Sequence, residues 1–266
     1  MPDIVSQQIS RFVEDGFIIL RGIASQTQCE AILERSRVAI QDNTEPIEYE
    51  ADLHYPGAPS SRFVHGGGTP RRLLDAFSRG HEFQAWCGER EVVDWLRSYF
   101  QRDVVCSMTH HNCVMTKHGS FGSSTGWHRD LRYWHFGRGD LVSSWLALGT
   151  ENATNGGLSF IPGSHRMKLE SDRFDSALFL RSETPENRSL IATAVSPCLA
   201  AGDVVLFHAR TLHSAGRNQD ARTKISLVFT YHADDDLPKP GTRSASRPGV
   251  RIPEDPLAAR VHLAHN

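Results

Sequence analysis

The spacing of hydrophobic residues changes along the chain, from a helical period in the first hundred residues to short apolar runs thereafter. Residues 5–15, 26–41, 70–79 and 89–100 carry apolar side chains at helical spacing, with charged residues between them. Gly16 ends the first of these segments, and the next residues form a short apolar run. The pattern predicts a largely helical scaffold over residues 1–103.

From residue 104 onward the apolar runs are short, rich in branched and aromatic residues, and separated by Gly, Asn, Pro and Ser. The runs that predict strands are residues 104–117, 141–150, 158–161, 204–207 and 225–231. Charged residues 169–187 predict an inserted loop and helix, and residues 233–266 predict a surface tail. At 266 residues the chain fits one domain, which we expect to be mainly β with flanking helices.

Residues 43–69 are rich in Gly, Pro, Ser and His and predict one long loop. Long loops on rigid scaffolds often take part in recognition, so this segment is a candidate lid over a binding site. A plain surface connection explains the same composition.

Composition excludes several classes of protein. The net charge of −2 gives no global field for nucleic acid. No apolar run of about 18 residues is present, so we expect no membrane insertion. Five scattered cysteines without C-x-x-C spacing indicate neither a disulfide framework nor a zinc cluster, so we expect a cytoplasmic protein. The sequence carries no signal for oligomeric state.

His128 and Asp130 form the candidate centre of the chemistry. Side chains two residues apart on an extended strand point to the same face, so imidazole and carboxylate can bind one ion. His213 follows another apolar run and is the best candidate for a third ligand. Two histidines and one carboxylate form the facial triad that holds non-haem Fe(II) and leaves coordination positions open.

Several motifs together resemble the phytanoyl-CoA dioxygenase family. In chain order they are Lys117, His128-Arg129-Asp130, Trp145, Asn155-Gly156-Gly157, Pro162-Gly163-Ser164-His165, Gly202-Asp203-Val204, His213, Asn218 and Arg222. The resemblance extends from Glu14 to His232. It implies a double-stranded β-helix, or jelly roll, whose cofactor is Fe(II) and whose co-substrates are 2-oxoglutarate and O2. It leaves the substrate open.

Hydroxylation of an unactivated C–H bond, with release of succinate and CO2, is the outcome that the resemblance implies. Halogenases that resemble this family replace the carboxylate ligand with a small residue, so Asp130 argues against halogenation. The resemblance also implies that Trp145 lies near 2-oxoglutarate, although a core tryptophan fits its position equally well. Lys117 is a candidate for binding a carboxylate, with a solvated loop lysine as the alternative.

Arg222 and Lys224 are the two candidates for anchoring the distal carboxylate of 2-oxoglutarate. Counting forward from His213 favours Lys224, whereas the residues of the following strand favour Arg222 if the turn is two residues shorter. We expect Arg222, because strand register is constrained more strongly than turn length and a guanidinium grips a carboxylate with two hydrogen bonds.

Basic and aromatic residues cluster around the metal motif and predict a small, anionic organic substrate. The candidate substrate-binding residues are Arg129, Arg132, Tyr133, His135 and His111. Such a substrate would be an acyl thioester, amino acid, natural product or sugar acid. Ordinary surface charge is the alternative explanation.

Two other functions use similar residues. Two histidines and a carboxylate also hold Zn with an activated water, so a zinc hydrolase is one alternative. A jelly-roll binding module that has lost turnover is the other. A cation after His213 favours the oxygenase, because a hydrolase has no need to anchor a dicarboxylate there.

Overall fold

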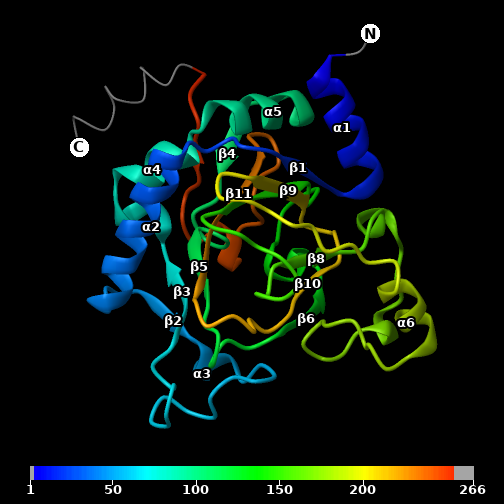
Figure 1. Ribbon diagram of the computed structural model, residues 1–266. Helices are drawn as coiled ribbons and strands as arrows, with labels where there is room; N and C mark the ends of the chain where they lie inside the picture. The colour runs from blue at the N-terminus through cyan, green and yellow to red at the C-terminus, as the bar shows by residue number, and fades with distance from the viewer. Residues whose placement is uncertain (1–2, 255–266) are drawn as a thin grey trace.

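A computed structural model describes residues 3–254 and contains two antiparallel sheets (Figure 1). The large sheet is formed by β1 (Phe17–Leu20), β2 (Ile47–Tyr49), β3 (Pro70–Leu74), β4 (Val104–Cys106), β5 (Cys113–Lys117), β7 (Leu141–Ala147), β9 (Val204–His208), β11 (Lys224–Ala233) and β12 (Val250–Arg251). The small sheet is formed by β6 (Thr125–His128), β8 (Leu158–Phe160) and β10 (His213–Ala215). This pair of sheets is the predicted jelly roll.

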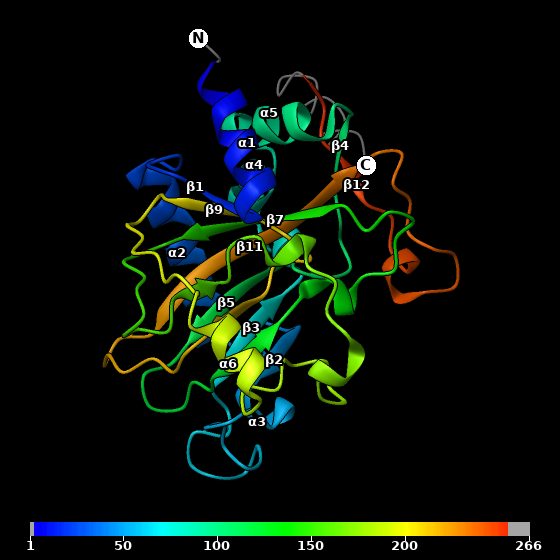
Figure 2. The same cartoon turned by 90° about the vertical axis from the view of Figure 1, so that its right-hand side faces the viewer.

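The large sheet has the strand order β1-β9-β7-β11-β5-β3-β2, and β4 extends β11 at its far end. In the small sheet β10 lies between β6 and β8. Strand neighbours in both sheets are distant in sequence, which is why the fold brings residues near 70, 115, 145 and 225 together. Figure 2 shows β11 running across the middle of the molecule.

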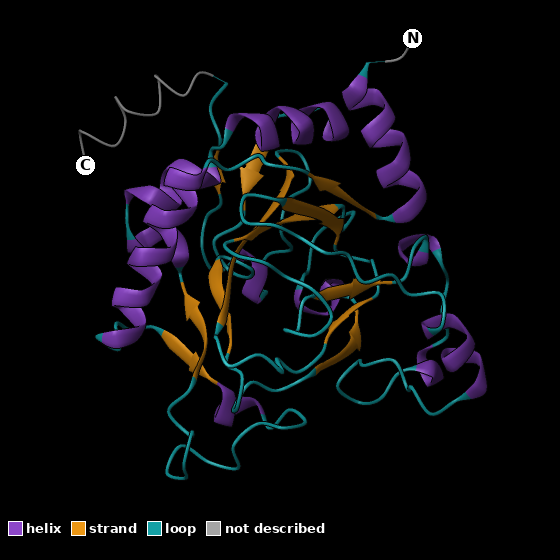
Figure 3. Cartoon of the chain, viewed as in Figure 1, coloured by secondary structure: helices purple, strands orange, loops and turns teal. Residues whose placement is uncertain are grey.

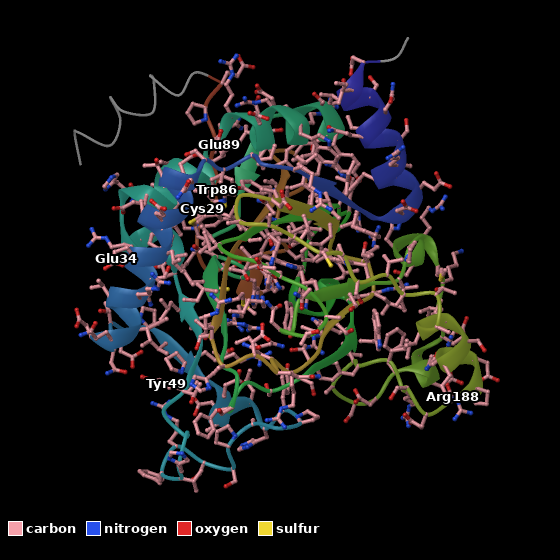
Figure 4. The ribbon with its side chains drawn as sticks, viewed as in Figure 1. Cys29, Glu34, Tyr49, Trp86, Glu89 and Arg188 are labelled. Carbon is pink, nitrogen blue, oxygen red and sulfur yellow. The ribbon has the colours of Figure 1, made fainter. Side chains whose placement is uncertain are left out.

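The helices are α1 (Ile4–Asp15), α2 (Gln26–Gln41), α3 (Glu50–Leu53), α4 (His81–Cys87), α5 (Arg90–Phe100) and α6 (Pro185–Ile191). Four of the helices, α1, α2, α4 and α5, cover the outer face of the large sheet, whereas α3 and α6 lie elsewhere (Figure 3). Cys29 of α2 and Trp86 of α4, both labelled in Figure 4, are buried in this helix–sheet core. Among residues 3–254, no helix combines the length and apolar character needed to cross a membrane.

Alternation along β11 explains why its two faces differ. Leu227 and Phe229 pack against the helices, whereas Val228 faces the space between the sheets with Trp145 and Phe207. All ten residues of β11 are buried. The central strand therefore joins the helical core to the wall of the inner cavity.

The predicted helices over residues 5–15, 26–41 and 89–100 are confirmed by α1, α2 and α5. Gly16 ends α1 with a left-handed backbone, φ +83°, and an added Cβ atom would collide with the ring of His165. The prediction of one helix over residues 70–79 is wrong. That segment forms β3 and a short 3-10 helix, because pairing with β5 and β2 outweighs its helical spacing.

The segment 43–69, predicted as one loop, contains β2 and α3 before an irregular stretch over residues 54–69. Arg62 holds this stretch to the fold, because it pairs with Asp52 at 3.0 Å and its guanidinium lies 3.2 Å from the centroid of the Tyr49 ring. Phe63 at its tip is 99% exposed. The stretch is thus held to the fold through Arg62, and the next residue exposes an aromatic ring.

Candidate active site

His128, Asp130 and His213 come together at one end of the small sheet. His128 is the last residue of β6 and lies directly opposite His213, the first residue of β10. Asp130 begins a short 3-10 helix (Asp130–Tyr133) immediately after β6. The antiparallel pairing therefore places ligands separated by 85 residues of chain on adjacent strand ends.

The three side chains converge on one point. One ligand atom from each lies within 4.8 Å of the other two, and Asp130 Oδ1 is 3.4 Å from His128 Nε2 and 3.5 Å from His213 Nε2. Each Nδ1 lies within hydrogen-bond distance of a backbone oxygen, Gly126 O at 2.9 Å and Thr211 O at 3.0 Å. These contacts orient both Nε2 atoms toward the carboxylate.

Burial sets the charges that a metal needs. Loss of solvent lowers the pKa of His128 to about 4 and lowers that of His213, so both imidazoles are neutral at pH 7. Burial opposes ionisation of Asp130, but His111, His213 and His128 hold the pKa of its carboxyl well below the usual value. Both carboxylate oxygens are buried without a hydrogen-bond partner. Neutral imidazoles beside an available carboxylate fit a divalent cation.

A cavity extends from these ligands between the two sheets and ends at two lysines. Lys117 of β5 and Lys224 of β11 are paired in the sheet register, and both are buried in the cavity wall. The Lys117 ammonium donates to Gly216 O at 2.7 Å, and burial is the largest cause of its pKa falling to about 7. Two cations therefore lie at the end of the cavity, away from the metal ligands.

Glu151 neutralises one of these cations, and sequence reasoning missed it. Its carboxylate accepts hydrogen bonds from Lys224 at 3.0 Å, from the Ser226 hydroxyl at 2.6 Å and from Trp145 Nε1 at 3.2 Å. Trp145 thus lies in the cavity wall with its N–H satisfied, as both readings of its sequence position allowed. An isolated acidic residue after an apolar strand was the available signal.

Arg222 does not line this cavity, whereas Lys224 does, so the expected anchor and its alternative lie in different places. It is exposed in the bend before β11 and lines a depression on the outer surface with Arg37 and Asp220. Ile225 and Leu227 both face the helix–sheet core, as predicted, but residues 221–223 are not extended. The alternation of side-chain direction holds only along an extended strand, so the inward direction of Lys224 gives no information about Arg222, which lies in the bend before the strand.

β3 contributes two further cations, which the incorrect prediction of a helix over residues 70–79 did not place near the site. Arg71 is buried and donates to Glu50 at 3.0 Å, Ser123 at 2.7 Å and Thr125 at 2.8 Å. Arg72 pairs with Glu48 at 3.2 Å and lines the cavity. Two adjacent arginines in an apolar segment were the signal; both lie within 4.0 Å of Glu48, and only Arg71 also reaches Glu50.

A second space adjoins the metal ligands on the side of β3. Arg72 and His111 line both spaces. Its other walls include the aromatic or basic residues Tyr55, His110, Tyr133, Arg243 and Arg247 and the acidic residues Glu48 and Asp75. We refer to this second space as the outer chamber. Burial lowers the pKa of His110 to about 3, so this imidazole is neutral at pH 7.

The expected substrate-binding residues do not form one surface. His111 and Tyr133 line the outer chamber, whereas Arg132 contacts it from behind by donating to the hydroxyls of Tyr55 and Tyr133. Arg129 instead donates to the carbonyls of Ser164 and Met167, and His135 is exposed. Neither Arg129 nor His135 belongs to the wall of either space.

A jelly roll with a buried His–Asp–His triad and a cationic inner cavity defines the class of Fe(II)/2-oxoglutarate-dependent oxygenases. A family model described as "Phytanoyl-CoA dioxygenase (PhyH)" matches residues 12–226. The chain therefore belongs to the phytanoyl-CoA dioxygenase family, and it is a dioxygenase that uses Fe(II) and 2-oxoglutarate.

Individual relatives are distant. The chain is 22% identical to "Probable phytanoyl-CoA dioxygenase" of Caenorhabditis elegans, over 88% of this chain and 77% of the relative. It is 24% identical to "Probable alpha-ketoglutarate-dependent hypophosphite dioxygenase" of Stutzerimonas stutzeri, over 80% and 76%. The crystal structure of EctD from S. alaskensis with 2-oxoglutarate and 5-hydroxyectoine superposes with a TM-score of 0.74 at 19% identity, covering 92% and 84%. This last similarity concerns the fold.

Proposed function

We propose that this dioxygenase hydroxylates an unactivated C–H bond of a small, anionic organic substrate. The observation that carries the proposal is one continuous cavity that has three buried metal ligands at one end and two buried lysines at the other. A dicarboxylate bound to the metal through its keto acid needs a cation at its far end. A zinc hydrolase has no such need.

In this proposal His128, Asp130 and His213 bind Fe(II). When bound, Fe(II) supplies oxygen activation coupled to oxidative decarboxylation of 2-oxoglutarate. The backbone oxygens at each Nδ1 keep the imidazoles aimed at the ion, and the apolar wall formed by Phe207 and Leu158 excludes water from its surroundings. The chain thus contributes geometry and a dry, shaped cavity.

Lys224 is the residue that we assign to the distal carboxylate of 2-oxoglutarate, with Lys117 as its partner. Because Glu151 already balances one positive charge, the two lysines together carry a net charge of about +1 when Lys117 is protonated. That charge matches a single carboxylate. Trp145 supports the arrangement, because its indole N–H fixes the Glu151 carboxylate and its ring lies 5.0 Å from the Lys224 ammonium.

We assign the substrate to the outer chamber. Arg72 and His111 lie where the chamber meets the metal ligands, and the neutral His110 imidazole and the tyrosines offer polar contacts without an excess of acid. Glu48 and Asp75 pair with Arg72 and Arg247. Arg243 has no side-chain partner within residues 3–254 and is free to bind an anionic group.

The irregular stretch 54–69 is positioned to cover the outer chamber, and we propose that it closes over bound substrate. Tyr55 lines the chamber, whereas Phe63 is exposed at the tip. Proteolysis within 54–69 should slow when metal, 2-oxoglutarate and substrate are all present. We further propose that residues 3–254 belong to one catalytic domain, because helices and sheet share one apolar core.

Anaerobic titration tests the proposed function directly. Fe(II) and 2-oxoglutarate added together should produce the weak visible charge-transfer band of an iron-bound keto acid, and the Asp130→Ala variant should not. A screen for succinate release with acyl thioesters, amino acids, natural products and sugar acids then identifies the substrate class. Absence of the band together with zinc-dependent hydrolysis would overturn the proposal.

A further inference from the structure

His111 lies beside the metal ligands without belonging to their set. Its Nε2 atom is 3.3 Å from Asp130 Oδ1, as near as either ligand histidine. Within the described part of the chain, however, only His128, Asp130 and His213 bring ligand atoms within 4.8 Å of one another. His111 therefore approaches the carboxylate from a side that the two other imidazoles do not share.

Buried polar atoms without hydrogen-bond partners meet at this contact. His111 Nε2 and both Asp130 oxygens are buried and make no aligned hydrogen bond to any described residue. Oδ1 is also the oxygen that lies nearest to both ligand imidazoles, and a carboxylate oxygen can accept a hydrogen bond through one lone pair while the other faces a metal. Carboxylates that bind metals are normally held by hydrogen bonds of their own, and the nearest imidazole N–H fits that need.

The backbone of His111 has a conformation that is uncommon for a residue with a side chain. Its φ of +47° lies in the left-handed region that favours glycine. The turn is held next to it by Asn112, which donates to Asp75 at 3.0 Å and accepts from the N–H of Phe77 at 2.8 Å. A glycine would satisfy this turn at lower cost, so the imidazole itself is the feature to explain.

Neighbouring rings fix the direction of the imidazole. Tyr133 packs edge-on against it with ring centroids 5.7 Å apart, and Trp134 lies at 6.1 Å. Both rings belong to the segment that directly follows Asp130 in the chain. The same short segment thus carries the metal ligand and holds the imidazole that faces it.

We propose that His111 is a positioning residue that donates its Nε2 hydrogen to Asp130 and thereby fixes how this carboxylate faces the metal. The inference rests on the proposed metal-binding role of Asp130. It differs from the substrate-binding role expected from the sequence, since a substrate contact would alter the KM for substrate and leave metal affinity unchanged.

Metal affinity of the resting protein tests this role without turnover. Mn(II) titration of metal-depleted protein, followed by electron paramagnetic resonance, gives the Kd for wild type and variants. His111→Gly should weaken Mn(II) binding about 10- to 100-fold without lowering the unfolding temperature, because glycine suits the backbone. His111→Gln retains an amide N–H at a similar distance and should recover most of the affinity.

His81→Ala is the control, since it removes an imidazole that is 84% exposed on α4; its Mn(II) affinity should equal that of wild type. Wild-type affinity in His111→Gly would overturn the proposal. So would a loss as complete as that of Asp130→Ala, which would make His111 a ligand. If the glycine variant fails to fold, His111→Leu and His111→Gln must differ in affinity. Wild type that binds no Mn(II) or Fe(II) would instead overturn the proposed function.

Discussion

The two sheets of this dioxygenase divide stability from chemistry. In the large sheet β11 and β7 are buried over their full lengths of ten and seven residues. In the small sheet β6 and β10 have four and three residues, several of them partly exposed, and their register shifts between His213 and Ala215. The candidate metal ligands lie on the small sheet or directly after its strand β6, whereas the lysines lie on the large one.

This difference indicates where function is separable from folding. Ligands at short strand ends can be replaced without opening the apolar core, so their loss should affect chemistry first. Lys224 belongs to the buried central strand and pairs with buried Glu151, so its loss should affect both binding and stability. Four predictions test this distinction, beginning with the largest effect.

Replacing any metal ligand should remove turnover and leave the fold. His128→Ala, Asp130→Ala and His213→Ala should each lose coupled formation of succinate and product to background, because no other described side chain completes the site. Circular dichroism and the unfolding temperature should change little. A variant that keeps near-normal coupled turnover would remove its residue from the ligand set.

Shortening a buried side chain of the central strand should have the opposite effect: stability should fall while metal binding is retained. Leu227→Ala removes a fully buried side chain from the helix–sheet core and should lower the free energy of unfolding by about 2 to 5 kcal/mol. The folded fraction should still bind one metal ion per chain. Leu178→Ala, at a site that is 51% exposed, is the control and should change stability by less than about 0.5 kcal/mol. Loss of metal binding by folded Leu227→Ala would contradict the division between the sheets.

Removing the Lys224 charge should weaken binding of 2-oxoglutarate by about 2 to 3 kcal/mol, or roughly 30- to 150-fold, with Lys117 still present. Lys224→Gln should raise the KM for 2-oxoglutarate by this factor, while Arg222→Gln should have little effect. The reverse ranking would return the anchor to Arg222.

Lys224→Gln also leaves the Glu151 carboxylate buried without its cation, which should lower stability. The double variant Lys224→Gln with Glu151→Gln removes that charge and should recover stability without recovering affinity. Recovery of both would assign the binding defect to misfolding of the cavity and not to the lost charge.

The smallest expected effect is a pH dependence that comes from Lys117. The pKa of about 7 means that this ammonium is charged below pH 7 and largely neutral above it. Arg71 and Lys224 oppose its charge, whereas Glu50 and Glu151 favour it. A bound carboxylate favours the protonated form, so 2-oxoglutarate should bind best below pH 7 and weaken by at most about tenfold per pH unit above it.

Isothermal titration calorimetry in buffers of different ionisation enthalpy measures the proton uptake that this model requires. Lys117→Met should bind 2-oxoglutarate more weakly and should take up fewer protons near neutral pH. Equal proton uptake by wild type and Lys117→Met would assign the titration to another group.

Local patterns in the sequence predicted most of the elements and the three residues that the fold brings together as candidate metal ligands. Helical spacing before residue 104 and short apolar runs after it predicted the division into helices and strands, because these periods depend only on near neighbours. His128 and Asp130 were recognisable because two-residue spacing places both side chains at one strand end. His213 followed from the residue types that complete such a site.

The tertiary structure decided which charged groups reach the cavity. β3 exists because residues 70–74 find partners in β2 and β5, which no local pattern reveals. Lys224 faces inward because pairing with Lys117 starts the strand there, whereas the bend before it directs Arg222 outward. Glu151 joins Lys224 across 73 residues of chain. Strand pairing and turn shape join residues that are distant in sequence, and the low dielectric between the sheets then requires each buried charge to find a partner.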